Sequence, residues 1–274
     1  MVWDKWGDLQ GAGVEFVGET YIGRDKTVDG LFAEGFDAVF LGVGSGIDAK
    51  MEKTPGTDLL GVYESTDFLI RGNVDMQYLP ADKNEPPQVG KRVVVIGGGD
   101  TASDCLRTAL RLGAAEVTCL YRRTENEMPG GKKDRQLAVE EGAKYRFLTQ
   151  PVKFIPGGDG HLAAVECLEM ELGEPDDSGR RRPVPIEGSN FSVAADTAIL
   201  ALGYWPDPVI GETTPDLETH NWGLIKVVDE ETGATTREGV FSGGDCVTGP
   251  SIVGEAMAAG IKAAQAIDAY LKSN

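Results

Sequence analysis

Short apolar runs separated by turn residues extend along the chain, and two of them flank a helical pattern. Residues 92–96 read Arg-Val-Val-Val-Ile, which predicts a buried β-strand. Apolar residues then recur at helical spacing over 101–112, and Gly113 follows where that helix should end. A second apolar run covers 116–121. Strand, helix and strand in this order predict a βαβ unit with parallel strands.

The turn between the first strand and the helix has the spacing of a phosphate-binding loop. It consists of Gly97, Gly98, Gly99, Asp100, Thr101 and Ala102. In this pattern Gly97 permits the tight turn, Gly99 lets the backbone approach a pyrophosphate, and Ala102 allows close packing of helix and strand. The helix N-terminus adds unpaired N–H groups. We therefore predict that these six residues bind a dinucleotide.

Two arginines at the end of the second strand indicate which dinucleotide. An acidic residue at this place binds the ribose 2′-hydroxyl of NAD, whereas arginine accommodates the 2′-phosphate of NADP. This chain has Arg122 and Arg123. Guanidinium groups bind phosphate oxygens bidentately, so the sequence predicts NADP(H) rather than NAD(H). The alternative is that both arginines are merely solvated.

The other runs predict a nucleotide-binding domain that is inserted into a second α/β domain. Before it we expect strands at 14–17 and 37–42 and a linker at 82–87; after the βαβ unit, a helix near 132–141, a strand at 145–148, an antiparallel meander (152–155, 162–172, 191–193) with turns at 157–160 and 176–179, a strand at 197–202 that ends at Gly203, a strand at 239–242, a turn at 243–245, and a helix at 251–271. The expected segments are 1–89, 90–205 and 206–274.

Charge is distributed unevenly along the 274 residues. Residues 91–196 hold 15 basic and 17 acidic residues, a net charge of −2, so the rest carries −16 of the total −18. A less negative domain suits an anionic ligand, whereas the overall charge makes nucleic-acid or anionic-membrane binding unfavourable. No apolar stretch reaches the roughly 20 residues of a membrane span, and no secretory segment opens the chain. We expect a cytoplasmic protein.

Metal centres and nucleophilic triads find no support in the sequence. The four cysteines (Cys105, Cys119, Cys167 and Cys246) show neither C-x-x-C nor metal-ligand spacing, so we predict no metal site and four small core residues. The two histidines, His161 and His220, lie in polar, loop-like contexts without triad partners. We therefore assign no catalytic residue.

The chain resembles the NADPH-dependent flavoprotein reductases with two dinucleotide domains, and most closely the glutamate synthase small (β) subunit. The resemblance covers nearly the whole chain. It rests on the glycine turn, on Asp104-Cys105-x-Arg107-Thr108-Ala109-x-Arg111-x-Gly113-Ala114, Tyr121-Arg122-Arg123, Glu127-Met128-Pro129-Gly130, Gly243-Gly244-Asp245 and the helix at 254–266. It implies a Rossmann-like NADP-binding domain, at 90–205, inserted into a partial FAD-binding domain formed by 1–89 and 206–274.

The resemblance also implies roles for residues at the ends of later strands. Ala201 and Gly203 should approach NADPH, while Gly244 and Asp245 should contact the flavin ribityl chain and Ser251 should open the helix that points at the flavin. Hydride would pass from NADPH to FAD, and electrons onward to an acceptor subunit, either a glutamate synthase large subunit or a ferredoxin-type carrier. Direct transfer between cofactors requires no acid–base residue.

The chain departs from this family in one respect. No strand–G-x-G-x-x-G–helix precedes Lys91 to hold the FAD pyrophosphate. Gly42-Val43-Gly44-Ser45-Gly46 has the wrong spacing and no helix behind it. We therefore expect the chain to correspond to the C-terminal portion of a larger reductase. NADP binding should persist, FAD binding is doubtful, and the open flank of the flavin sheet should favour self-association.

Two other functions remain open. One is a nucleotide-binding module that is catalytically silent until a partner supplies the flavin. The other is a dehydrogenase that uses NADP alone, which would require a Tyr-x-x-x-Lys or a His/Asp pair near the nicotinamide, and the sequence contains neither. The visible absorption spectrum of the purified protein separates these functions from a flavoprotein.

Overall fold

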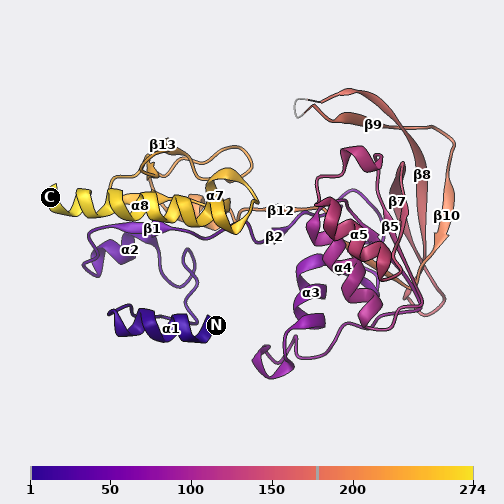
Figure 1. Ribbon diagram of the computed structural model, residues 1–274, viewed down its shortest axis with the longest axis horizontal. Coiled ribbons are helices and arrows are strands. Elements are labelled where there is room, and N and C mark those ends of the chain that lie inside the picture. The colour runs from indigo at the N-terminus through magenta and orange to yellow at the C-terminus, as the bar shows by residue number, and fades with distance from the viewer. Residues whose placement is uncertain (1, 177–178, 274) are drawn as a thin grey trace. The chain divides into compact units, whose positions relative to one another are not determined.

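The computed structural model describes residues 2–176 and 179–273 and divides into two compact units (Figure 1). The first unit combines Met1–Ile47 with Trp205–Asn274, and the second is Asp48–Tyr204. The second unit is thus an insertion in the first. Its two ends lie together, because the Ala49 N–H donates a 2.9 Å hydrogen bond to the Gly203 carbonyl.

A parallel sheet forms the centre of the second unit. Its five strands follow the order β3-β11-β4-β5-β6, and every neighbouring pair is parallel. The strands are β3 (Val62–Glu64), β11 (Thr197–Leu200), β4 (Arg92–Ile96), β5 (Glu116–Leu120) and β6 (Lys144–Arg146). The β4–α4–β5 order confirms the predicted βαβ unit. The sheet begins with β3, which the sequence analysis had left as loop.

Alternation along β4 places two apolar layers on opposite faces of this sheet. Val93 and Val95 belong to one buried cluster, which includes Leu106 of helix α4 (Asp100–Arg111). Val94 and Ile96 belong to another, which includes Val165 of the antiparallel strands. The helices α3 (Ser65–Asn73), α4 and α5 (Lys132–Glu140) lie on the first face, as Figure 1 shows. The unit therefore has three layers.

The antiparallel layer consists of a meander with one strand more than predicted. Strand β8 is paired on one side by β7 and β10 and near its far end by β9. Their bounds are β7 (Thr149–Pro156), β8 (Leu162–Pro175), β9 (Arg181–Pro185) and β10 (Phe191–Ala194). Strand β9 was missed because its arginines and prolines are typical of a loop; prolines are tolerated at a sheet edge. Of the predicted turn at 176–179, Asp177 and Ser178 lie outside the described residues.

The first unit contains a small mixed sheet of order β1-β15-β14-β13. Strand β1 (Val39–Leu41) runs parallel to β15 (Val240–Ser242), whereas β14 (Ala234–Thr235) and β13 (Val227–Asp229) pair antiparallel. The helices here are α1 (Val2–Gly11), α2 (Val28–Ala33), α6 (Val209–Thr213), α7 (Asp245–Thr248) and α8 (Val253–Ser273). Two further short strands, β2 (Ile47–Asp48) and β12 (Tyr204–Trp205), pair with each other, and single 3₁₀ turns lie at Met76–Tyr78 and Glu125–Glu127.

Two predictions about this unit were wrong in detail. Residues 14–17 form no strand; instead the ring of Phe16 stacks on Trp6 of α1 with centroids 3.5 Å apart. The predicted helix at 251–271 begins at Val253, and the separate short helix α7 precedes it. Gly249 and Pro250 interrupt the path between the two helices.

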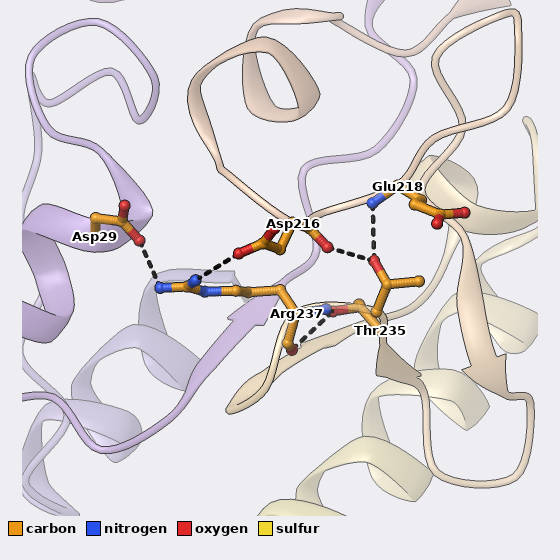
Figure 2. Close-up of polar contacts among 6 residues, drawn as sticks. Asp29, Asp216, Glu218, Thr235 and Arg237 are labelled. Atoms are coloured by element: carbon orange, nitrogen blue, oxygen red, sulfur yellow. Dashed lines mark hydrogen bonds and ion pairs between the residues drawn. The ribbon is translucent and has the colours of Figure 1, made fainter.

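An arginine-centred network connects three distant segments of the first unit. Figure 2 shows the Arg237 guanidinium between the carboxylates of Asp29 and Asp216, at 2.9 and 3.3 Å. The Thr236 hydroxyl donates to the Asp216 carbonyl and accepts from the Glu218 N–H. The network thus joins α2 to the turn before β15 and to the loop at 216–218.

The boundary between the units differs from the predicted one at residue 89. Residues 48–89 belong to the second unit, because β3 pairs with β11 and α3 packs against α4. The segment 82–87 looks like a linker in sequence, yet it only connects α3 to β4 within one unit. In the described part of the chain no helix is long and apolar enough to cross a membrane.

Candidate functional site

The turn from β4 into α4 can be built only with glycine at its first position. Gly97 has φ = +145°, and a Cβ there would lie 2.0 Å from the carbonyl oxygen of Ala201. The turn is therefore pressed against the end of β11. Gly99 differs, since a Cβ at this position would meet nothing within 4 Å. The surface at Gly99 is open to a ligand.

Helix α4 directs free backbone donors out of this turn. Gly99 is its N-cap residue and offers no side chain to its own helix. Within residues 2–176 and 179–273 no acceptor binds the N–H groups of Asp100 or Thr101. Such N–H groups and the helix dipole together favour a phosphate. Ala102, by contrast, is buried against the core.

A second glycine pair packs onto the same turn. The Gly130 N–H donates to the Gly98 carbonyl at 3.1 Å, and the Gly131 N–H donates to the Asp100 carboxylate at 2.6 Å. A Cβ on Gly130 would lie 2.8 Å from the carbonyl carbon of Gly99. Asp100 thus has a structural partner. Sequence analysis quoted this segment but gave it no role, because its contact with the turn is formed by backbone.

The two arginines after β5 occupy different environments. Arg122 is exposed, and among the described residues it has no hydrogen-bond or ion-pair partner. Arg123 is buried: its Nη2 donates to the Asp176 carboxylate at 2.8 Å and its Nε to the Arg181 carbonyl at 2.7 Å. Arg123 therefore holds the β8–β9 hairpin. The prediction that both arginines face a phosphate needs this correction.

Arg122 lies in a positive field. Its pKa is lowered by partial desolvation and by the nearby Arg123, with a further contribution from Arg180. Two cationic side chains beside a solvent-exposed guanidinium repel it, and an anion would relieve that repulsion. The signal was available in the sequence as the run Arg180-Arg181-Arg182, but nothing in the sequence places that run beside Arg122.

The residues expected at the end of β11 follow the strand as predicted. Ala201 is buried, and its N–H donates to the Ile96 carbonyl at 2.9 Å. Its carbonyl faces Gly97, so it positions the glycine turn. A Cβ on Gly203 would meet nothing within 4 Å. Gly97 and Ala201 are thus brought together, and Gly203 lies two residues beyond.

The residues expected to contact a flavin lie in the first unit. Gly244 has φ = +78° and precedes Asp245, the first residue of α7. The Asp245 carbonyl accepts from the Ser45 hydroxyl at 2.8 Å. Ser251 precedes α8, and its hydroxyl donates to the Glu255 carboxylate. Ser251 therefore has an internal partner one turn into the helix.

The four cysteines are free and buried. Burial raises the pKa of the Cys119 and Cys167 thiols to about 12, so neither is a thiolate at neutral pH. In the described part of the chain no group of His, Cys, Asp or Glu side chains is arranged to hold a metal ion. The chemistry of the site therefore belongs to backbone donors and arginine.

Comparison with known proteins identifies relatives over nearly the whole chain. Residues 9–260 match the family described as pyridine nucleotide-disulphide oxidoreductase. The putative oxidoreductase AegA of Escherichia coli is 44% identical over 269 residues, which are 94% of this chain and 40% of AegA. The small chain of glutamate synthase [NADPH] of the same organism is 39% identical over 266 residues, 96% of this chain and 56% of that protein. The chain thus spans about half the length of such relatives.

Solved structures share the fold. FprA of Mycobacterium tuberculosis in complex with NADPH superposes with a TM-score of 0.71 at 20% identity, over 92% of this chain and 67% of FprA. Thioredoxin reductase of T. acidophilum gives a TM-score of 0.56 at 18% identity, over 85% and 65% of the two chains.

These matches also agree with the α/β architecture of a parallel sheet combined with antiparallel strands. Members of the matched family bind FAD and NAD(P)H. The chain belongs to the pyridine nucleotide-disulphide oxidoreductase family and is an oxidoreductase similar to the glutamate synthase small chain.

Proposed function

We propose that the chain is the NADPH-binding part of a flavoprotein oxidoreductase, in which hydride passes from NADPH to FAD and electrons pass on to an acceptor subunit. The observation that supports it best is the open N-terminus of α4 behind the Gly97 turn, with the exposed Arg122 at the end of the adjacent strand β5. Parallel neighbours β4 and β5 end at the same edge of the sheet, where dinucleotides bind in this architecture.

Each residue of this edge has a proposed part. The N–H groups of Asp100 and Thr101 would bind the pyrophosphate, which approaches over Gly98 and Gly99. Arg122 would bind the 2′-phosphate, while Arg123 acts through the hairpin that it holds. Ala102 and Ala201 would keep the turn in place by packing. Gly203, without a side chain, would leave room for the nicotinamide end.

FAD would find only part of a site in the described residues. The Gly244–Asp245 turn suits a ribityl chain, and Ser251 precedes the long helix α8. A second strand–glycine turn–helix for the FAD pyrophosphate is not found within residues 2–176 and 179–273. When bound, FAD supplies the hydride acceptor; the protein's own residues bind and orient NADPH.

A catalytically silent NADP-binding module remains the second candidate, and this incomplete flavin site favours it. Among the relatives are the β subunits of an NADP(+)-dependent formate dehydrogenase of Moorella thermoacetica and of an NADPH-Fe(3+) oxidoreductase of Geobacter sulfurreducens. Each is named as one subunit of an assembly. We propose that this chain likewise acts with an acceptor subunit.

Titration calorimetry with NADPH and NADH tests the nucleotide assignment. We expect NADPH to bind more tightly, and equal affinities would contradict it. The visible absorption spectrum of the same protein then separates the two candidates. Flavin bands that bleach on addition of NADPH support the reductase, whereas a colourless protein that binds NADPH supports the silent module.

A further inference from the structure

An open pocket lies at the β6 edge of the parallel sheet in the second unit, beside helix α5. Its volume is about 690 Å³, which is in the range of small-molecule sites. Helix α5 contributes Arg135 and Val139, and the chain around β6 contributes Lys144, Tyr145 and Phe147. None of its lining residues belongs to the dinucleotide site proposed above.

Arg135 brings a buried donor without an acceptor into this pocket. Its side chain is only 7% exposed, and its Nη1 donates to the Gly130 carbonyl. The Nε atom is buried and has no hydrogen-bond partner. The nearest carboxylate oxygen, Oε1 of Glu125, is 3.9 Å away, which is too far for a hydrogen bond. A buried guanidinium N–H left unpaired is costly, so this atom suits an external acceptor.

Tyr145 contributes a second buried polar atom. Its hydroxyl is also without a hydrogen-bond partner. Burial raises the pKa of this hydroxyl, the Cys119 thiol adds to the shift, and the neighbouring Ser103 and Arg135 oppose it. The hydroxyl therefore stays protonated and can donate. Two unpaired donors in one pocket call for an acceptor with two oxygen atoms.

The rest of the lining combines positive charge with apolar surface. Lys132 and Lys144 join Arg135, against the single carboxylate of Glu125. This excess of positive charge stands out in a chain of net charge −18. Val139, 54% exposed, and the ring of Phe147, stacked near that of Tyr145, provide the apolar part. An anion with a flat apolar body matches both properties.

We propose that this pocket binds a small aromatic carboxylate. The carboxylate accepts from Arg135 Nε and the Tyr145 hydroxyl, and the ring lies against Val139 and Phe147. Lys132 and Lys144 attract the anion from the rim. The site is separate from the proposed nucleotide site, so both ligands bind at once.

Titration calorimetry of the full chain with 2-naphthoate tests this. We expect one saturable site per chain, unchanged by saturating NADPH. Neutral 2-naphthamide and ring-free acetate should each bind at least about tenfold more weakly. No saturable binding up to about 10 mM, or 2-naphthamide binding as tightly as 2-naphthoate, overturns the proposal. Displacement of 2-naphthoate by NADPH also overturns it, since the probe would then occupy the nucleotide site.

Variants tie the binding to this pocket. Tyr145→Phe removes one hydroxyl, and Val139→Glu places a carboxylate at the exposed rim; each should weaken 2-naphthoate by about tenfold. Lys133→Gln changes the net charge as Val139→Glu does, from a position on α5 outside the pocket, and should have no effect. Equal affinity in Val139→Glu, with an unchanged melting temperature, contradicts the proposal. NADPH affinity of these variants is measured in parallel, so a failure of the nucleotide assignment is recognised separately.

Discussion

Arg123 and Asp176 are 53 residues apart in sequence, yet Nη2 of the arginine lies 2.8 Å from the aspartate carboxylate. The pair ties the loop that leaves β5 to the end of β8. Its neighbour Arg122 extends into solvent. Adjacent arginines that look equivalent in sequence therefore serve two purposes: one holds the hairpin, and the other is available to a ligand.

This difference predicts opposite effects for two alanine variants. Arg122→Ala should reduce NADPH affinity by about 1–3 kcal/mol and leave NADH affinity and the melting temperature nearly unchanged. Arg123→Ala should lower the free energy of unfolding by about 1.5–3 kcal/mol, because it removes hydrogen bonds from a buried guanidinium. Calorimetry and thermal unfolding measure the two effects. Loss of stability in Arg122→Ala, with Arg123→Ala intact, would reverse the assignment.

The glycine turn predicts a second contrast. Gly97→Ala should destabilise the protein by at least about 1–3 kcal/mol, because the new Cβ meets the Ala201 carbonyl and φ is positive. Gly99→Val should leave the fold intact and weaken NADPH and NADH alike, by about tenfold or 1.4 kcal/mol, since its side chain occupies the open approach. Unchanged nucleotide affinity in Gly99→Val would show that the phosphate lies elsewhere.

Glu141 predicts a pH dependence of stability. Hydrogen bonds from Arg111 and Arg107 lower the pKa of its carboxyl below the ordinary 4.5. The folded state thus holds the carboxylate more strongly than the unfolded state does. The resulting stabilisation is complete above the ordinary pKa and is lost as the pH falls through the lower folded-state value.

The difference in stability between the wild type and Glu141→Gln should therefore be constant at neutral pH and shrink below about pH 4.5. Denaturant unfolding at a series of pH values measures it. Glu140→Gln, one residue away with only a glutamine partner, is the control and should show a smaller difference throughout. A difference that grows towards acid pH would contradict the clamp by the two arginines.

The network around Arg237 should stabilise the first unit. Arg237→Met keeps much of the side-chain volume but removes both ion pairs, to Asp29 and Asp216. Because these carboxylates are partly exposed, the expected loss is modest, about 1 kcal/mol. Lys262→Met, which removes an ion pair to the exposed Glu231, should cost less and serves as the comparison. Thermal unfolding followed in 1 M salt should narrow the gap between wild type and Arg237→Met.

Local sequence patterns predicted the parts of the fold that depend on local interactions. The strand at 92–96, the helix that follows and the next strand were placed within about one residue of their observed ends, because β-branched runs, helical spacing and Gly113 all act locally. The glycine turn was found for the same reason.

Features that depend on distant partners could not be predicted in this way. Strand β3 exists because β11 pairs with it, and β9 because β8 does; neither has the composition of a strand. Residues 14–17 have that composition but no partner strand, and Phe16 packs on Trp6 instead. The separate environments of Arg122 and Arg123, and the unpaired donors of Arg135 and Tyr145, follow from packing across dozens of residues.

The hydrogen bond between Ala49 and Gly203 has a consequence for how such a chain could be rearranged. A segment that enters and leaves at one point can be cut out, and its neighbours rejoined, without stretching the flanking backbone. Residues 48–204 are therefore a transplantable module. Ancestral insertion and loss, circular permutation at this junction, and grafting into an unrelated host are all topologically simple.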